Sequence, residues 1–393
     1  MWKRTLRTAA VGLLATALPG AALAASLQQG TAVRAATPSA AIERFARQIA
    51  ADVAHDDVGA ITAGVFVGSE IVWAQGFGWA DRDRRIAADV NTIYRIGSIS
   101  KSFTALLMTQ LAARDALDID KLLSDYLPEA KQLAGGADTL AAVTLRRLAS
   151  HTGGLIREPE LPGAAAGPIA MWQDKILASI PMTSFLAAPG ERYSYSNIGF
   201  GMLGLAISRA AGRPFMDLVT AYIIEPLEMK QTVFVMTPEL YPSLAVGYSV
   251  ARDGTISPDR PAFEHWGRGY KVPNGGVYST VGDLARFAGA ITGTSAAEVL
   301  PPDWRREMMR VQTPESPTAG YGLGFSVRTR ESGVRTVGHG GSVAGYNANL
   351  VFDPMSKVGV VLLRNYNRGN TNLGRSAAEL LEELVQEGMG RRE

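Results

Sequence analysis

Residues 357–363 read KVGVVLL, and from Val358 onward the stretch is almost continuously apolar. This composition is typical of a strand that is covered on both faces, because neither side of the sheet then meets water. Two β-like runs near the other end of the chain, 61–67 and 71–79, are joined by the short segment 68–70 (GSE) and predict a hairpin. Further strand candidates are 322–327, 334–337 and 348–352. Strands are therefore expected at both ends of the chain.

Much of the remaining chain has the periodicity of helices, with apolar residues three and four positions apart. In the middle of the chain, two such stripes are formed by Phe103, Leu106, Leu107 and Leu111, and by Ile198, Met202, Leu205 and Ile207. An amphipathic helix is also expected from about residue 41, and a last one from about Thr371 to Glu387, where Gly388 ends it. We therefore expect one domain over 41–393, with a sheet built from both chain ends, flanking terminal helices, and a mainly helical insert at about 102–290.

The first 24 residues have the pattern of a secretory signal peptide. Lys3, Arg4 and Arg7 form a basic start, an apolar run follows over 9–18, and Ala22-Leu23-Ala24 is a small-x-small cleavage site. A membrane anchor is the alternative, but the run is well short of the ~20 apolar residues that a spanning helix needs. We expect residues 1–24 to be a signal peptide and 25–40 a linker. The mature chain is then exported, either periplasmic or secreted, without a stable membrane span.

Charge and cysteine content exclude several function classes. Removal of the signal peptide takes away three basic residues and no acidic one, which leaves a nearly neutral protein without the positive charge typical of nucleic-acid binding. The chain has no cysteine, which rules out a disulfide scaffold, a lipid-modified cysteine, a thiol nucleophile and a thiolate metal site. No feature of the sequence indicates an oligomeric state.

The first candidate for chemistry is the pair Ser98 and Lys101. The pair lies where a β-like segment, 92–96, passes through Gly97 into a helix, and residues three apart on a helix share a face. A serine hydroxyl is a weak nucleophile that needs a nearby base, and a lysine whose pKa is lowered by burial can supply it. The alternative is an ordinary helix-capping serine followed by an exposed lysine.

The second candidate is the pair Tyr195 and Asn197, which follows the turn Pro189-Gly190. A tyrosine presented from a loop can carry a proton between a lysine, a serine and a leaving group. An asparagine both donates and accepts hydrogen bonds, so it can orient a substrate amide. The alternative is a polar turn before a helix.

The third candidate is Gly338-His339-Gly340-Gly341-Ser342, which follows the strand candidate 334–337. Glycines there allow a substrate to lie against the strand backbone. The N–H of Ser342, together with that of Ser98, can form an oxyanion hole. The alternative is a glycine-rich bend with a surface histidine.

Another histidine, His151, lies in Ser150-His151-Thr152-Gly153-Gly154. We expect it to have a structural role, because a histidine at a turn is often only a hydrogen-bonding element. The stretch from Gly153 to Gly167 is rich in Pro, Gly and Ala and predicts a loop, which fits either a lid or a surface excursion.

Taken in order, these pairs resemble the signature of the serine β-lactamase and penicillin-binding-protein superfamily. The similar branch holds class C β-lactamases, D-alanyl-D-alanine carboxypeptidases and family VIII esterases. The superfamily has S-x-x-K, then Y-x-N, then K-T-G or H-x-G, which correspond here to Ser98/Lys101, Tyr195/Asn197 and His339/Gly341. The segments 94–101, 143–155 and 275–284 are similar as well, and the resemblance covers the chain from about residue 41 to its end.

The resemblance implies a β-lactamase/transpeptidase-like fold of the α/β class, an α+β sandwich whose antiparallel sheet is built from both chain ends. It implies Ser98 as a nucleophile that forms an acyl-enzyme, while Lys101 and Tyr195 share the general-base and proton-shuttle roles in an undecided order. The implied substrate-binding residues are Asn197, His339, Gly341 and Ser342. No metal or organic cofactor is implied, and the expected partner is a small-molecule or peptide substrate.

The H-x-G motif in place of K-T-G affects the expected substrate. A lysine is fully charged at neutral pH, whereas a histidine with the ordinary pKa of ~6.5 is mostly neutral, so His339 should hold a substrate carboxylate less firmly. We therefore expect hydrolysis of esters or D-amino-acid peptides rather than efficient β-lactam hydrolysis. A true class C-like β-lactamase and a penicillin-binding sensor that acylates without turnover are the alternatives. An α/β-hydrolase is disfavoured because 340–344 lacks the nucleophile elbow G-x-S-x-G.

Overall fold

The computed structural model describes residues 33–34, 39–135, 142–313, 315–316 and 318–390. Its centre is a nine-stranded antiparallel sheet in the order β1-β3-β2-β13-β12-β11-β10-β9, with β4 paired to β3. The strands are β1 (Val33–Arg34), β2 (Ala60–Val67), β3 (Glu70–Asp81), β4 (Ile86–Ala87), β9 (Ala319–Tyr321), β10 (Ser326–Thr329), β11 (Arg335–Val343), β12 (Tyr346–Phe352) and β13 (Val358–Arg364). The two ends of the chain meet where β2 pairs with β13. The predicted antiparallel sheet built from both ends is therefore confirmed.

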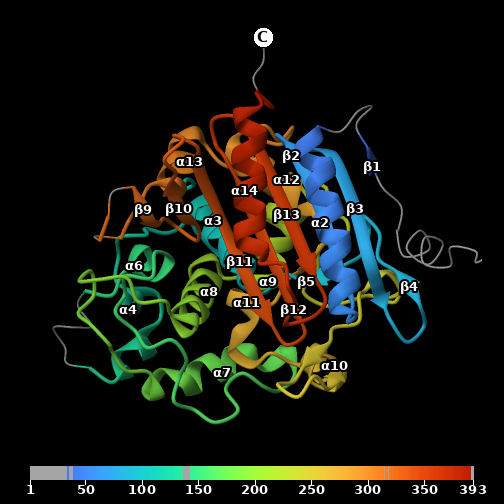
Figure 1. Cartoon of the computed structure of the whole chain (residues 1–393). Helices are drawn as coiled ribbons and strands as arrows, with labels where there is room; N and C mark the ends of the chain where they lie inside the picture. The colour runs from blue at the N-terminus through green and yellow to red at the C-terminus, as the bar shows by residue number, and fades with distance from the viewer. Residues whose placement is uncertain (1–32, 35–38, 136–141, 314, 317, 391–393) are drawn as a thin grey trace, which may run out of the picture.

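Helices cover both faces of this sheet. On one face lie α2 (Ala40–Asp56) and α14 (Leu373–Gln386), which pack against outward side chains of β2, β3 and β13 (Figure 1). The opposite face holds the larger core, to which α3 (Ser100–Ala112), α8 (Asn197–Ala211) and α12 (Val281–Thr292) contribute. Because both faces are covered, all seven residues of β13 are buried, which accounts for the apolar run 358–363.

The insert between β4 and β9 is mainly helical. Its other α-helices are α4 (Leu123–Tyr126), α6 (Leu145–Ala149), α7 (Trp172–Ser179), α9 (Phe215–Val219), α10 (Asp259–Trp266), α11 (Val272–Gly275) and α13 (Pro302–Met309). Short 3₁₀ segments are η1 (Gly97–Ile99), η2 (Pro128–Gln132), η3 (Ile169–Met171), η4 (Ile180–Met182), η6 (Tyr241–Ser243) and η7 (Gly269–Lys271), and η5 (Thr220–Ile224) is a π-helix. Two small sheets pair β5 (Tyr94–Arg95) with β8 (Tyr278–Ser279), and β6 (Ser249–Val250) with β7 (Ile256–Ser257).

Two strand predictions were wrong in their extent. Of the candidate 322–327, only Ser326 and Val327 belong to a strand, β10. Residues 322–325 form the bend between β9 and β10, where Gly324 has a φ of 74° and a Cβ would be 3.0 Å from the carbonyl oxygen of Lys101 in α3. The candidate 334–337 is only the start of β11, which continues to Val343. The segment 338–342 therefore lies inside a strand rather than after one.

The N-terminal predictions meet the structure only in part. The predicted signal peptide, residues 1–24, lies outside the described residues. Within the predicted linker 25–40, Val33 and Arg34 pair with β3, and Ala40 begins α2. Among the residues that the structure describes, no helix combines the length and apolar character that crossing a membrane requires.

Asn365 follows β13 directly and joins both ends of the chain through one buried side chain. Its Oδ1 accepts a hydrogen bond from the N–H of Ala60 at 2.6 Å. Its Nδ2 donates to the carbonyl oxygens of Trp79 (3.1 Å), Ala80 (3.1 Å) and Val246 (2.8 Å). Backbone groups at the ends of β2 and β3 therefore depend on this amide.

Replacing Asn365 with alanine should lower the free energy of unfolding by about 3 kcal/mol, because several buried backbone groups lose their partner at once. Urea denaturation at neutral pH measures this loss. The exposed Asn370 supplies the control, since its replacement by alanine should stay within about 0.5 kcal/mol of the wild type. Equal stabilities of the two variants would contradict the role given to Asn365.

Candidate active site

Ser98 lies where the chain leaves β5 and enters α3 through η1. The preceding Gly97 has a φ of 52°, a left-handed conformation that favours glycine. A Cβ on Gly97 would also lie 2.7 Å from the backbone nitrogen of Ser342. Because Ser98 is in the first turn of a helical segment, its N–H has no partner within the helix. Ser98 is partly exposed although its neighbours Gly97 and Ile99 are buried.

Lys101 is fully buried, and oxygen atoms surround its amino group. Its Nζ lies 3.1 Å from Ser98 Oγ, 2.7 Å from Asn197 Oδ1 and 3.1 Å from the carbonyl oxygen of Asn274. Burial lowers the pKa of Lys101 well below its ordinary value, and the positive charge of Arg157 lowers it further. Lys101 is therefore not the exposed lysine that the alternative interpretation of the sequence required.

Tyr195 lies just before α8, with its ring beside Lys101. The Lys101 Nζ is 4.8 Å from the centroid of that ring. Burial raises the pKa of Tyr195 to about 12, and an interaction with the side chain of Ser98 opposes that rise. The phenol is therefore protonated at neutral pH and stands next to both Ser98 and Lys101.

Asn197 is the first residue of α8, whose N-cap Ser196 accepts a hydrogen bond from the N–H of Gly199. The amide oxygen of Asn197 accepts from Lys101, and its amide nitrogen donates to Glu158 Oε1 at 2.6 Å. Because its oxygen faces a donor and its nitrogen faces an acceptor, the orientation of this amide is fixed. The amide nitrogen also carries a second hydrogen, which is left for a further acceptor.

Strand β11 passes Ser98 at very short range. A Cβ on Gly341 would lie 2.0 Å from the carbonyl oxygen of Ile96 and 3.3 Å from the nitrogen of Ser98. Only a residue without a side chain permits this approach, which brings the backbone of Ser342 next to Gly97 and Ser98. The two N–H groups of the predicted oxyanion hole thus belong to adjacent segments.

His339 lies on the same strand, but it is buried and both of its ring nitrogens have partners. Nδ1 is 2.6 Å from the carbonyl oxygen of Gly340, and Nε2 is 2.7 Å from the hydroxyl of Tyr321. A carbonyl only accepts, so Nδ1 carries the hydrogen and Nε2 accepts from Tyr321. Burial lowers the pKa of His339 to about 3, so the ring is neutral. The departure from a charged lysine is therefore larger than the sequence indicated.

A cavity of about 780 Å³ opens onto Ser98. Asn197, Asn274 and Ser342 line it, and residues 163–166 of the predicted loop 153–167 contribute to its wall. A second cavity of about 910 Å³ lies between the edge strands and α14, and its lining includes His339 but not Ser98. Of the predicted site residues, Ser98, Asn197 and Ser342 line the first cavity, whereas His339 lines the second.

Two polar groups of this site, Asn274 and Glu158, were missed by the sequence analysis. Asn274 takes part through its main-chain oxygen, which no residue type reveals. Glu158 holds Asn197 and lies 3.5 Å from Lys271 Nζ, but it comes from an irregular loop in which spacing carries no geometric information. The only available signal was its position a few residues after the His151 segment.

The sequence of this chain matches a known protein family. The model of the family described as Beta-lactamase matches residues 45–384. The chain belongs to the Beta-lactamase family. Its fold is that of the β-lactamase and penicillin-binding-protein superfamily, as the ordered motifs predicted. Among the residues described, no group of three or more histidine, cysteine, aspartate or glutamate side chains forms a potential metal site.

Individual relatives share only a modest sequence identity with this chain. "Protein flp" of Staphylococcus aureus (strain MW2) is 24% identical over 300 residues, which cover 75% of this chain and 57% of that protein. "D-alanyl-D-alanine-carboxypeptidase/endopeptidase AmpH" of Escherichia coli (strain K12) is 30% identical over 217 residues, 54% of this chain and 52% of that protein. The chain thus spans a little over half the length of the curated relatives it matches.

Two solved structures show the same fold. The octameric penicillin-binding protein homologue from Pyrococcus abyssi superposes with a TM-score of 0.71 at 23% identity, covering 89% of this chain and 78% of that one. A D-stereospecific amidohydrolase from Streptomyces sp. superposes with a TM-score of 0.70 at 24% identity, covering 88% and 98%. These likenesses confirm the β-lactamase/transpeptidase-like architecture.

Replacing Gly341 with alanine should slow labelling of Ser98 by a fluorophosphonate about 100-fold, because the new methyl group displaces β11 from the nucleophile. Labelling rate constants measure the effect. Gly340 is the matched control, since a Cβ there meets nothing closer than 3.7 Å. Its alanine variant should keep the rate within about twofold, as expected for a substitution in open space. Similar losses in both variants would contradict this account of the close approach.

Proposed function

We propose that this chain hydrolyses ester or amide bonds, including those of D-amino-acid peptides, through an acyl-enzyme on Ser98. The observation that carries the proposal is the 3.1 Å contact between the buried Lys101 Nζ and Ser98 Oγ, because a serine hydroxyl needs a base in this position. Ser98 Oγ attacks the substrate carbonyl, its proton passes to the base, and the leaving alcohol or amine takes up a proton. Water then attacks the acyl-enzyme, releasing the acid and restoring the serine.

Lys101, rather than Tyr195, is the proposed first base. The oxygens of Asn197 and Asn274 only accept, so they take both hydrogens of a neutral amino group. The lone pair of Nζ is then left for the Ser98 hydroxyl. The lowered pKa of Lys101 favours this neutral form, whereas the pKa of about 12 for Tyr195 makes its phenolate rare at neutral pH.

Tyr195 is the proposed proton donor to the leaving group. Its phenol is protonated and lies beside both Ser98 and Lys101, the lysine that has just received a proton. Donation of its hydroxyl proton to the departing oxygen or nitrogen, followed by transfer from Lys101, returns both groups to their starting states. The N–H groups of Ser98 and Ser342 are placed to stabilise the negative charge that develops on the substrate oxygen.

Two observations support esters and D-amino-acid amides as the substrate class. The matched relatives include a D-alanyl-D-alanine carboxypeptidase/endopeptidase and a D-stereospecific amidohydrolase. His339 is neutral and has no free ring nitrogen, so it does not supply the cation that the lysine of K-T-G would offer to a carboxylate. His339 and Gly341 are therefore proposed to shape the substrate wall, while Asn197 binds the substrate amide.

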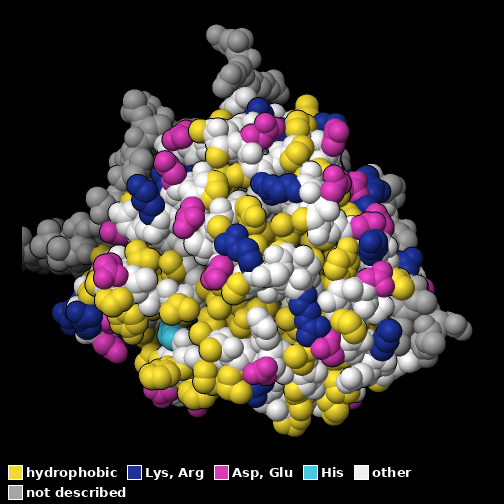
Figure 2. Space-filling view, turned by 180° about the vertical axis from the view of Figure 1, so that it is seen from behind, with side chains coloured by type: hydrophobic (Ala, Val, Ile, Leu, Met, Phe, Trp, Pro, Cys, Tyr) yellow, Lys and Arg dark blue, Asp and Glu magenta, His cyan; other side chains and the backbone are white. Residues whose placement is uncertain are grey.

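The proposed partner is a small molecule or peptide, without nucleic acid and without a metal or organic cofactor. Basic and acidic side chains are interspersed over the face seen in Figure 2, where no continuous basic stripe is visible among the described residues. We also propose that the chain is exported to the periplasm or the medium through the predicted signal peptide, residues 1–24.

Replacing Ser98 with alanine should abolish fluorophosphonate labelling and reduce turnover by roughly 10³-fold or more, because no other group forms the acyl bond. A panel of p-nitrophenyl butyrate, a D-Ala-D-Ala peptide and a chromogenic cephalosporin measures turnover, and the first two should exceed the third. Undiminished labelling of the variant would remove Ser98 as the nucleophile. Acylation without turnover would indicate a sensor, and preference for the cephalosporin a class C-like β-lactamase.

The pH dependence of kcat/KM separates the two candidate bases. With Lys101 as the base, kcat/KM should fall about tenfold for each pH unit below the lowered pKa of this lysine and reach a plateau well below pH 10. With the phenolate of Tyr195 as the base, the rate would still rise at pH 10, because the pKa of that phenol is about 12. A continuous rise through pH 10 for p-nitrophenyl butyrate, corrected for spontaneous hydrolysis, would contradict the assignment to Lys101.

A further inference from the structure

We infer that His151 is a positioning residue that fixes the Tyr195–Asn197 segment against Lys101, a role that rests on the proposed function. The sequence predicted only a structural histidine in a turn. In the structure its ring is buried beside Tyr195, and its backbone and its side chain hold the segment that carries both Tyr195 and Asn197.

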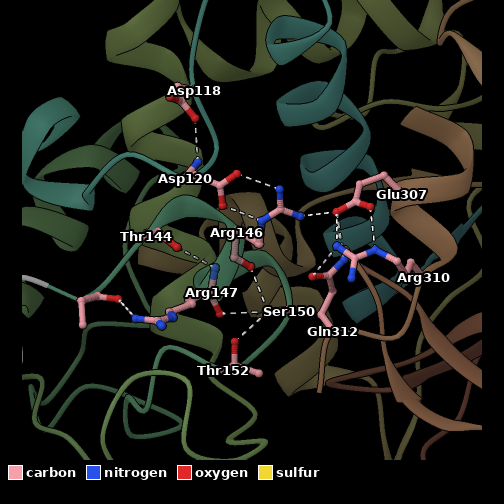
Figure 3. A network of polar contacts seen from close by, with 11 residues as sticks. Asp118, Asp120, Thr144, Arg146, Arg147, Ser150, Thr152, Glu307, Arg310 and Gln312 are labelled. Carbon is pink, nitrogen blue, oxygen red and sulfur yellow. Dashed lines mark hydrogen bonds and ion pairs between the residues drawn. The ribbon is translucent and has the colours of Figure 1, made fainter. Parts of the chain in front are cut away.

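The turn that carries His151 is anchored from its outer side (Figure 3). Ser150 Oγ donates to the carbonyl oxygen of Arg146 at 2.9 Å and shares a hydrogen bond with Thr152 Oγ1, also at 2.9 Å. Arg146 in turn pairs with Asp120 and Glu307, which come from distant parts of the insert. The position of the turn is therefore set independently of the residues that line the active site.

The backbone of His151 is in a conformation that does not favour histidine. Its φ is 57°, in the left-handed region, where glycine or asparagine is accommodated more easily. The carbonyl oxygen of this residue accepts a hydrogen bond from the N–H of Ser194 at 2.7 Å. Since any residue type offers that carbonyl, the backbone alone gives no reason for histidine. The reason must lie in the imidazole ring.

The imidazole ring makes one hydrogen bond, and it is to the segment between the two candidate residues. Nδ1 accepts from the N–H of Ser196 at 3.1 Å. Ser196 is the N-cap of α8, so its N–H has no partner in the helix. The hydrogen bond thus holds the single residue that separates Tyr195 from Asn197, and it requires the hydrogen of the neutral ring to be on Nε2.

The same ring is packed against the tyrosine. The ring centroids of His151 and Tyr195 are 4.1 Å apart with a 36° tilt, and Phe200 and Tyr321 lie at 4.9 Å and 4.7 Å. Burial lowers the pKa of His151 well below its ordinary value, and the nearby Lys101 lowers it further. A neutral ring can support Tyr195 without adding a buried charge beside Lys101.

The remaining ring nitrogen of His151, Nε2, has no hydrogen-bond partner among the residues that the structure describes. Nε2 is buried, as is His151 as a whole, which is only 1% exposed. A buried polar group without a partner costs about 1–3 kcal/mol, which a residue with a purely structural role would avoid. Strained backbone and unpaired polar atoms persist where function requires a particular side chain. Both occur here, in the residue behind Tyr195.

Two substitutions separate the two contacts of the ring. H151F keeps an aromatic surface behind Tyr195 but removes the acceptor for Ser196. H151N keeps an acceptor and tolerates the left-handed backbone, but it removes the ring. Each should lower kcat for p-nitrophenyl butyrate on the order of 10- to 100-fold per titrated active site, with KM changed less than about threefold, because small misplacements of catalytic groups act on the chemical step. H55N, at an exposed position of α2, is the matched control and should match the wild type.

Fluorophosphonate labelling gives two separate readings of these variants. The final amplitude counts intact sites, and the rate constant reports how well they are arranged. Variants that label at the wild-type rate constant, with only a smaller amplitude or a lower melting temperature, would show a purely structural role and overturn the inference. Failure of the wild type itself to label at Ser98 would instead overturn the proposed function.

Nitrogen-15 NMR of the wild-type protein tests the inference without any substitution of His151. The ring should be neutral, with its hydrogen on Nε2, across pH 6 to 8. A charged ring, or a ring with its hydrogen on Nδ1, would overturn the inference, because Nδ1 then could not accept from Ser196. This reading is decisive even where both His151 variants fail to fold.

Discussion

The burial of the Lys101 amino group among oxygen acceptors is the constraint on which the rest of the site depends. Lys101 is on α3, Asn197 begins α8, and Asn274 is in α11, and these three helices pack against one another. An amino group buried without such partners would be costly, because neither a charge nor a polar group is stable in an apolar core alone. The contacts among α3, α8 and α11 therefore both pack the insert and bury the amino group of Lys101, and this burial lowers the pKa of the lysine.

A second constraint joins this helical insert to the sheet. β11 comes from the C-terminal part of the chain and passes so close to η1 that neither Gly97 nor Gly341 has room for a side chain. Ser98, the proposed nucleophile, thus lies at a junction between segments more than two hundred residues apart in the sequence. A sheet assembled from both chain ends is what makes this junction possible, because β11 lies in the same sheet as β2 and β3, the strands that precede η1.

Much of this arrangement could be predicted because it depends on residue types and their order. The apolar run in β13 indicated a strand covered on both faces, and the order of Ser98, Tyr195 and His339 indicated the family. The role of Asn274 could not be predicted, because it acts through a backbone carbonyl. The extent of β11 was underestimated because glycines weaken any strand signal. The partner of His339, Tyr321, is 18 residues away in the sequence and adjacent only in the fold.

The charges around Lys101 bear both on its proposed role as the base and on the proposed binding of a substrate carboxylate. His339 is neutral, and besides Lys101 the Tyr195 ring is approached by Arg157, whose guanidinium lies 4.7 Å from the ring centroid. The side chain of Arg157 is 65% exposed, so water and salt screen its effect on the pKa of Lys101, and burial remains the larger cause. A neutral base produced mainly by burial does not need a charged strand residue beside it. Under the proposed mechanism, the histidine of H-x-G can therefore replace the lysine of K-T-G without affecting the activation of Ser98, and the proposed consequence is a lower affinity for a substrate carboxylate.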